Sequence, residues 1–112
     1  MTVTDSKKRT VNVGRLTLDL KSGDTRMDGE LIRMPQMEYK LLRFLVEHPD
    51  RVYTKRELIR EIWGYEALGQ SATLTVHINR LRKKLDDGAY GSVIETVWGV
   101  GYRFRGNEIK YL

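Results

Sequence analysis

The segment Thr73–Leu85, TLTVHINRLRKKL, carries the pattern that decides the fold. On a helix, at about 100° per residue, its large aliphatic side chains fall within roughly 40° of one another. This stripe consists of Leu74, Ile78, Leu81 and Leu85. The opposite arc is polar and basic: Thr73, Val76, Asn79, Arg80 and Lys83 at its centre, with His77 and Lys84 on one flank and Thr75 and Arg82 on the other. The pattern predicts a helix that packs on a core and exposes this arc.

The exposed arc has the dimensions and the chemistry of a DNA-reading surface. A helix about 10 to 12 Å across matches the major groove of B-DNA, which is about 12 Å wide. Arginine suits guanine O6 and N7, Asn79 suits adenine N6 and N7, and Val76 suits a thymine methyl group. A basic helix face that stands alone is more often a solvated surface, and docking on an acidic protein is a further alternative. The segments on either side of this helix are needed to choose between these functions.

A second helix precedes this one at helix-turn-helix spacing. Thr54-Lys55-Arg56-Glu57 is a capping box, in which the hydroxyl and the carboxylate satisfy free N–H groups at a helix start. Gly64 ends the helix, and residues 65–70 form a short loop before Ser71 or Thr73 caps the next one. The apolar face of this helix consists of Leu58, Ile59, Ile62 and Trp63.

The segment that follows the basic helix predicts a β-hairpin. Residues 93–97 and 102–105 are rich in β-formers and flank a turn, 98–101, that contains Trp98, Gly99 and Gly101. A hairpin after a helix-turn-helix can act as a wing that contacts DNA beside the second helix. The order of elements therefore favours DNA binding over a solvated surface.

Upstream of these helices, the pattern indicates one more helix and a small sheet. Pro35 suits the first turn of a helix that runs to Glu47, before His48-Pro49. Alternation of apolar and polar residues begins at Val11 and predicts antiparallel strands, with a hairpin turn at Asp28-Gly29. Residues 1–10 are polar and patternless, as in a linker or an expression remnant. The expected strands cover residues 11–13, 16–20, 25–28 and 30–34.

The composition limits the classes of protein that fit. The chain has 20 lysines and arginines against 15 acids, and the surplus of bases lies in residues 51–112. It has no cysteine, which excludes disulfides and zinc fingers, and its two histidines lie far apart. No apolar run approaches the roughly 20 residues of a membrane span, and the N-terminus lacks a signal peptide's apolar stretch. No catalytic nucleophile, phosphate loop or carboxylate pair is evident. We expect a cytoplasmic binding domain without enzyme activity, metal or cofactor.

Five segments together resemble the effector domain of OmpR/PhoB-type response regulators in order and spacing. They are residues 37–42 (MEYKLL), 52–58 (VYTKREL), 62–64 (IWG), 76–85 (VHINRLRKKL) and 94–104 (IETVWGVGYRF). The resemblance covers nearly everything from Leu16 to Arg105. It implies an α+β fold, a winged helix-turn-helix with a four-stranded antiparallel N-terminal sheet, a three-helix core and a C-terminal β-hairpin wing. The domain would then occupy residues 11–107, with 108–112 as a tail.

The resemblance also implies which residues meet DNA. The recognition helix, about 73–85, enters the major groove, and the wing, about 93–105, lies on the adjacent minor groove and backbone. The positions that correspond to base contacts are Val76, Arg80 and Thr96. The positions that correspond to phosphate contacts are Thr73, His77, Asn79, Arg82, Trp63 and Tyr102, and the helical wheel adds Lys83. For Trp63 and Tyr102, packing inside the fold is the alternative role.

For a whole protein, the resemblance implies a two-component transcription regulator. Such a protein has an N-terminal receiver domain, which this chain lacks, and a cognate sensor kinase that phosphorylates it. The chain is therefore expected to be a C-terminal half, monomeric when isolated, that binds direct repeats of promoter DNA as a head-to-tail dimer. By analogy, loop 64–70 contacts RNA polymerase. A regulator of unusual architecture and the DNA-binding half of a membrane-tethered activator stay open as alternatives.

Three departures from the family pattern bear on function. Residues 72–75 read Ala-Thr-Leu-Thr where the family commonly has Arg-Thr-Val-Asp, so a phosphate-binding arginine is missing. Trp98 stands where the wing commonly has a basic residue that reaches the minor groove. Pro35 replaces the usual threonine cap of the first helix. The details of docking on DNA are therefore expected to differ from those of the family.

Overall fold

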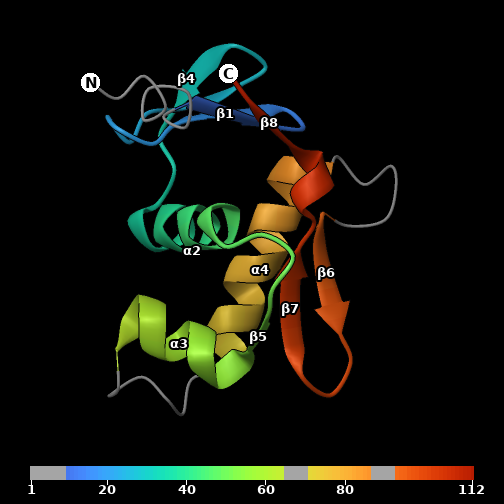
Figure 1. The fold of residues 1–112 in the computed structure, drawn as a ribbon. Helices are drawn as coiled ribbons and strands as arrows, with labels where there is room; N and C mark the ends of the chain where they lie inside the picture. The colour runs from blue at the N-terminus through green and yellow to red at the C-terminus, as the bar shows by residue number, and fades with distance from the viewer. Residues whose placement is uncertain (1–9, 65–70, 87–92) are drawn as a thin grey trace, which may run out of the picture.

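The computed structural model describes residues 10–64, 71–86 and 93–112, which form two antiparallel sheets and three helices (Figure 1). The N-terminal sheet lies at one end of the domain, and the helices and the second sheet lie beneath it (Figure 1). In chain order the elements are β1 (Thr10–Val13), β2 (Leu16–Asp19), β3 (Thr25–Met27), β4 (Glu30–Ile32), α2 (Gln36–Glu47), β5 (Val52–Thr54), α3 (Lys55–Trp63), α4 (Ser71–Asp86), β6 (Ile94–Val97), β7 (Gly101–Phe104), the 3-10 helix η2 (Gly106–Glu108) and β8 (Ile109–Tyr111). None of the helices in these described ranges has the length and hydropathy that a membrane span needs.

The N-terminal sheet has five strands in the order β4-β3-β2-β1-β8. The turn between β3 and β4 is where the sequence places it, and both of its residues have positive φ, 52° at Asp28 and 89° at Gly29, which suits a tight hairpin. The fifth strand comes from the C-terminus, where Ile109 pairs with Val13 and Tyr111 with Val11. The predictions of four strands and of a tail at 108–112 are therefore wrong. A three-residue strand with one buried side chain is too short to show a two-residue period.

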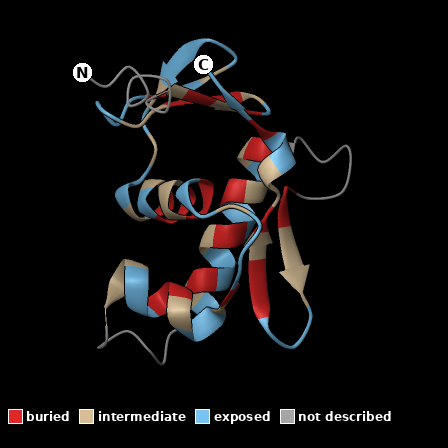
Figure 2. Ribbon diagram, in the orientation of Figure 1, coloured by how far each residue is buried: buried red, intermediate tan, exposed pale blue. Residues whose placement is uncertain are grey.

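The helices follow the predicted pattern except at the start of α4, which includes Ser71 and Thr73, so neither is the N-terminal cap that the sequence predicted. The capping box of α3 is present, because Glu57 N donates to Thr54 Oγ1 at 3.0 Å and Thr54 N donates to Glu57 Oε1 at 2.8 Å. Helix α2 begins after Pro35, which supplies no side-chain cap. Every residue of the aliphatic stripe of α4 is buried, and α4 packs against both α2 and α3 (Figure 2). The core lies between the helices and the two sheets.

The second sheet has three strands in the order β5-β7-β6, one more than the predicted hairpin. Strand β5, which lies directly before α3, pairs with β7 through Tyr53 and Tyr102. The backbones of β5 and β7 approach closely here. A Cβ atom added to Gly101 would overlap the Tyr53 carbonyl oxygen. Gly101 therefore allows β5 to join the sheet, and this strand fixes the hairpin to the start of α3. The fold is a winged helix-turn-helix of the α+β class.

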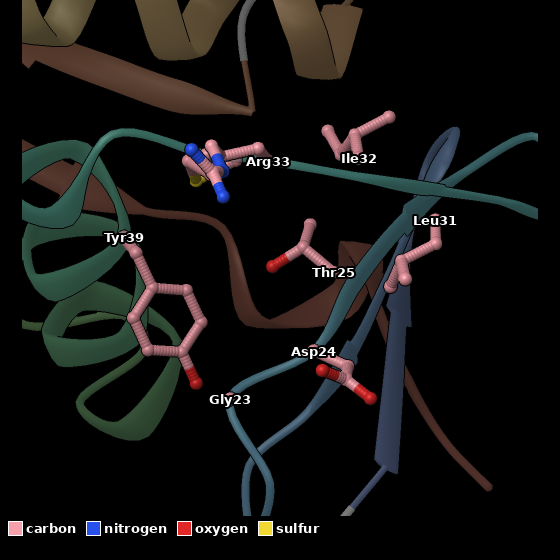
Figure 3. A pocket seen from close by; sticks show the side chains of 8 residues that line it. Gly23, Asp24, Thr25, Leu31, Ile32, Arg33 and Tyr39 are labelled. Carbon is pink, nitrogen blue, oxygen red and sulfur yellow. The ribbon is translucent and has the colours of Figure 1, made fainter.

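A pocket of about 440 Å³ opens between β3, β4 and α2 (Figure 3). It lies in the part of the domain away from the hairpin of β6 and β7 (Figure 1). The Thr25 side chain points into this pocket, and Tyr39 of α2 lies at its other side (Figure 3). The hydroxyls of Thr25 and Tyr39 are both buried, and neither has a hydrogen-bond partner among the described residues. None of the residues predicted to contact DNA lines this pocket.

Candidate nucleic-acid interface

The exposed face of α4 is the arc that the helical wheel predicts. Val76 is 44% exposed, and Asn79, Arg80 and Lys83 are also exposed. Thr73, His77 and Arg82 are half-buried along the margins of this face. The aliphatic stripe on the other side determines this orientation, because it is held against the core. The helix therefore presents two cations, an amide and one aliphatic side chain to an outside partner.

One cation of the predicted basic surface is used inside the domain. Lys84 Nζ lies 2.5 Å from Glu38 Oε1, and Glu38 is only 1% exposed. A buried carboxylate is very costly unless a cation pairs with it. Lys84 therefore joins α4 to α2 and contributes less positive charge to the surface than its place on the wheel indicated. The sequence did contain a signal, because Glu38 lies on the same face of α2 as Leu42 and Leu45.

Arg82 connects α4 to the hairpin. Its Nε and Nη2 donate to the Ile94 carbonyl oxygen at 3.1 and 2.7 Å, and Nη2 also donates to Thr96 Oγ1 at 2.6 Å. The guanidinium carbon lies 5.6 Å from the centre of the Tyr102 ring, within the range of a cation–π interaction. We call Arg82, Ile94, Thr96 and Tyr102 the α4–wing clasp. Three of these residues were predicted to contact DNA separately, and the structure brings them into contact with one another.

His77 and Trp63 meet where α3 ends and α4 begins. The rings lie 5.0 Å apart in an edge-to-face arrangement, and His77 Nδ1 lies 2.8 Å from the Thr73 carbonyl oxygen. A carbonyl oxygen only accepts hydrogen bonds, so the hydrogen of a neutral His77 is on Nδ1. Thr73, His77 and Trp63 thus form one cluster beside the exposed arc. The packing role that was the alternative for Trp63 is present.

The wing is the hairpin of β6 and β7, and its turn extends into solvent. Trp98 is 90% exposed and Val100 is 46% exposed. The turn is closed by a hydrogen bond from Val100 N to the Val97 carbonyl oxygen at 2.9 Å, and Gly99 has a φ of +79°. In the strands behind the turn, Arg103 Nη2 lies 2.5 Å from Glu95 Oε1. The turn itself therefore carries the apolar surface, whereas the charges lie farther back.

Helix α4 and the wing enclose a hollow of about 400 Å³. Thr75 and Asn79 line it from α4, Trp98 and Val100 line it from the wing, and Lys55 lines it from the start of α3. Lys55 is exposed, and it was not among the predicted site residues although it directly follows the Thr54 cap. One flank of the exposed arc, at Thr75 and Asn79, thus forms a single concave surface with the wing, whereas Val76, Arg80 and Lys83 lie on α4 outside the hollow.

The predicted polymerase-contacting loop, 64–70, lies outside the described residues except for Gly64. Within the described ranges, no group of three His, Asp or Glu side chains could hold a metal ion. What the described residues assemble is a concave surface lined by one exposed cation, Lys55, with the exposed Arg80 and Lys83 on the same helix as part of its lining, an arrangement suited to binding.

Comparison with known proteins places this geometry in a family. The family model for the C-terminal domain of transcriptional regulatory proteins matches residues 29–104. The phosphate regulon transcriptional regulatory protein PhoB of Escherichia coli (strain K12) is 40% identical over 89 residues, which are 80% of this chain and 39% of PhoB. The chain thus spans about two-fifths of the length of the curated relatives it matches.

Two solved structures have the same architecture. The response regulator DrrB of Thermotoga maritima, described as an OmpR/PhoB homologue, has a TM-score of 0.75 at 30% identity over 91% of this chain and 46% of DrrB. The RstA DNA-binding domain of Klebsiella pneumoniae, solved in complex with the RstA box, has a TM-score of 0.69 at 30% identity over 88% of this chain and 98% of that domain. The chain therefore belongs to the C-terminal domain family of transcriptional regulatory proteins, and its fold is the winged helix of the OmpR/PhoB response-regulator type.

Proposed function

We propose that this domain reads double-stranded promoter DNA with α4 in the major groove and the wing on the adjacent minor groove and backbone. The observation that carries the proposal is the concave surface that one flank of the exposed arc of α4, at Thr75 and Asn79, shares with the wing. A helix fits the major groove, and a hairpin fixed beside it reaches the next segment of the duplex. The structure of the RstA domain in complex with the RstA box supports the proposal, because that domain has the same fold over 88% of this chain.

The residues on this surface have different proposed roles. Arg80 and Val76 are exposed at the centre of the arc and contact base edges, while Asn79 and Lys83 contact phosphates beside them. Lys55, which lines the hollow, is a further phosphate contact. Thr73 and His77 contact phosphates from the margin, where Trp63 packs on His77. Thr96 and Tyr102 already contact Arg82 in the α4–wing clasp, so they contact DNA only through the atoms that the clasp leaves free.

For the whole protein, we propose a regulator in which a receiver domain, addressed by a cognate sensor kinase, controls this domain. Two copies would bind direct repeats head to tail, and loop 64–70 would contact RNA polymerase. The isolated domain would be monomeric, and its function would place it in the cytoplasm. The share of each relative that this chain covers supports the presence of further domains. The sequence predicts a domain over residues 11–107; we propose that the domain continues to the end of β8, because that strand pairs with β1 in the N-terminal sheet.

A binding-site selection from random duplexes, followed by fluorescence anisotropy at several salt concentrations, tests the proposal. The selected duplex should bind more tightly than a scrambled one, and affinity should fall steeply with salt. Arg80→Ala should cost about 1 to 3 kcal/mol of binding free energy and relax the preference at one base pair. Arg33→Ala removes the same charge from the pocket side of the domain and is the matched control. Equal binding of both duplexes would reject specific reading and leave docking on an acidic protein as the alternative function.

A further inference from the structure

Trp98 is the most exposed large apolar side chain among the described residues. It is 90% exposed, although an indole ring in water forgoes the large favourable free energy of burial. The turn that carries it is not loose, because Val100 N is bonded to the Val97 carbonyl oxygen and Gly99 has the positive φ that such a turn needs. The fold therefore holds an aromatic ring outward on a defined turn.

The position of this ring relative to α4 is also fixed. Trp98 borders the hollow opposite Thr75 and Asn79, which belong to the exposed arc. The α4–wing clasp fixes β6, the strand that leads into the turn, because Arg82 binds the Ile94 carbonyl and the Thr96 hydroxyl. A duplex that receives α4 in its major groove therefore meets Trp98 at the next part of its surface, which is the adjacent minor groove.

The chemistry of the turn selects one kind of contact. Residues 97–101, VWGVG, have no charged side chain, and the nearest basic residue on β7, Arg103, is paired with Glu95. The turn thus has no cation of its own that could bind a phosphate or enter a narrow, strongly negative groove. What it offers is an indole face next to an exposed valine. Apolar side chains of this kind act in minor grooves as wedges that partly unstack a base step.

We propose that Trp98 inserts into the minor groove as an apolar wedge and favours sites with a flexible pyrimidine–purine step at that position. This inference rests on the proposed DNA-binding function and adds a determinant of specificity to it. Pyrimidine–purine steps unstack at the lowest cost, whereas A-tracts are stiff and narrow. Trp98 therefore selects DNA by its deformability at a base pair with which it forms no hydrogen bond.

The test compares Trp98 variants on single-site duplexes that differ only at the step facing the wing, TA in one and an A-tract in the other. On the TA duplex, Trp98→Ala should weaken binding by about 5- to 150-fold, the range of one aromatic–base stack. On the A-tract duplex the loss should be much smaller, so the preference for TA should disappear. Because indole is uncharged, the slope of log affinity against log salt should not change. The matched control, Tyr111→Ala, removes an exposed aromatic ring from β8 and should have no effect.

Two further variants separate a wedge from a charge effect. Trp98→Phe should keep most of the affinity and most of the TA preference. Trp98→Arg should raise affinity for the A-tract duplex above that of the wild type and steepen the salt slope by about 0.9, because it adds one phosphate-neutralising cation. In bending assays, the wild type should bend the TA duplex more than Trp98→Ala does.

Several outcomes would overturn the inference and leave DNA binding intact. Equal affinity of the wild type and Trp98→Ala on the TA duplex would show that the ring makes no contact of value. Equal losses on both duplexes would refute reading by deformability. A loss seen only on a duplex with two sites would assign Trp98 to a contact between two copies of the domain. Failure of the wild type to bind any duplex would instead refute the proposed function itself.

Discussion

Replacing Arg82 with lysine tests whether this cation positions the wing or contacts a phosphate directly. Lysine keeps the charge but has a single ammonium in place of the planar fork. Arg82 donates three hydrogen bonds, two to the Ile94 carbonyl and one to Thr96, and a lysine can replace one of them. The variant therefore loses two bonds of a charged donor and most of the contact with the Tyr102 ring.

The magnitude follows from these lost contacts. A hydrogen bond that involves a charged group contributes about 1.5 to 3 kcal/mol net, and Arg82 is half-buried, so solvent screens part of that contribution. We expect Arg82→Lys to lower the free energy of unfolding by about 2 kcal/mol. In a domain of this size, such a change lowers Tm by about 10 °C. DNA affinity should also fall, because the wing is no longer fixed to α4, while the salt slope stays the same.

Urea and thermal unfolding measure the first effect, and anisotropy at several salt concentrations measures the second. Arg103→Lys is the matched control, because it makes the same arginine-to-lysine change in the wing itself, where the partner, Glu95, is partly exposed. That pair contributes about 0 to 1 kcal/mol. A Tm of Arg82→Lys within about 1 °C of the wild type would refute the clasp. Loss of about 0.9 of salt slope in Arg82→Ala would show instead that Arg82 contacts a phosphate.

Three further predictions concern the rest of the domain. Lys84→Met should cost about 3 kcal/mol of unfolding free energy in urea denaturation, because it leaves Glu38 buried without its cation, and Glu38→Leu added to it should recover most of that loss. Thr25→Val should stabilise the fold by about 1 kcal/mol, since it replaces a buried hydroxyl that has no partner among the described residues, and an unchanged Tm would count against it. The hydrogen bond from the Thr54 backbone lowers the pKa of Glu57 below its ordinary 4.5. The ionised carboxylate therefore stabilises the fold above pH 4.5, and this stabilisation is lost as the pH falls through the lowered pKa. Tm should therefore drop less between about pH 5 and pH 3 in Glu57→Gln than in the wild type, and parallel curves would contradict the prediction.

Local patterns in the sequence were sufficient for the helices and for the tight hairpin. The stripe of α4, the capping box at Thr54 and the turn at Asp28-Gly29 each depend on residues within a few positions of one another. Their physics is therefore visible in a short window of sequence. The exposed arc of α4 could be predicted for the same reason, because burial of one helix face determines which residues remain outside.

The features that sequence did not predict depend on pairs that are far apart in the chain. Strands β5 and β8 have three residues each, and only their partners β7 and β1 define them. Lys84 and Glu38 lie 46 positions apart, so the wheel of α4 alone showed a free cation. The α4–wing clasp likewise requires the hairpin to return to the helix. A single helical wheel finds which side chains point outward, but it does not show which of them already have partners in the fold.

Strand β8 also has a practical consequence for anyone who expresses or fuses this domain. With β8 in place, β1 lies inside the sheet, between β2 and β8. A chain cut at residue 107 would turn β1 into an outer strand, and its unpaired backbone groups could template association with other chains. The Leu112 amide also donates to the Thr10 carbonyl oxygen at 3.0 Å, so the first and last described residues are joined directly. The two ends of the described chain therefore lie together at the sheet end of the molecule, opposite the turn of the wing (Figure 1).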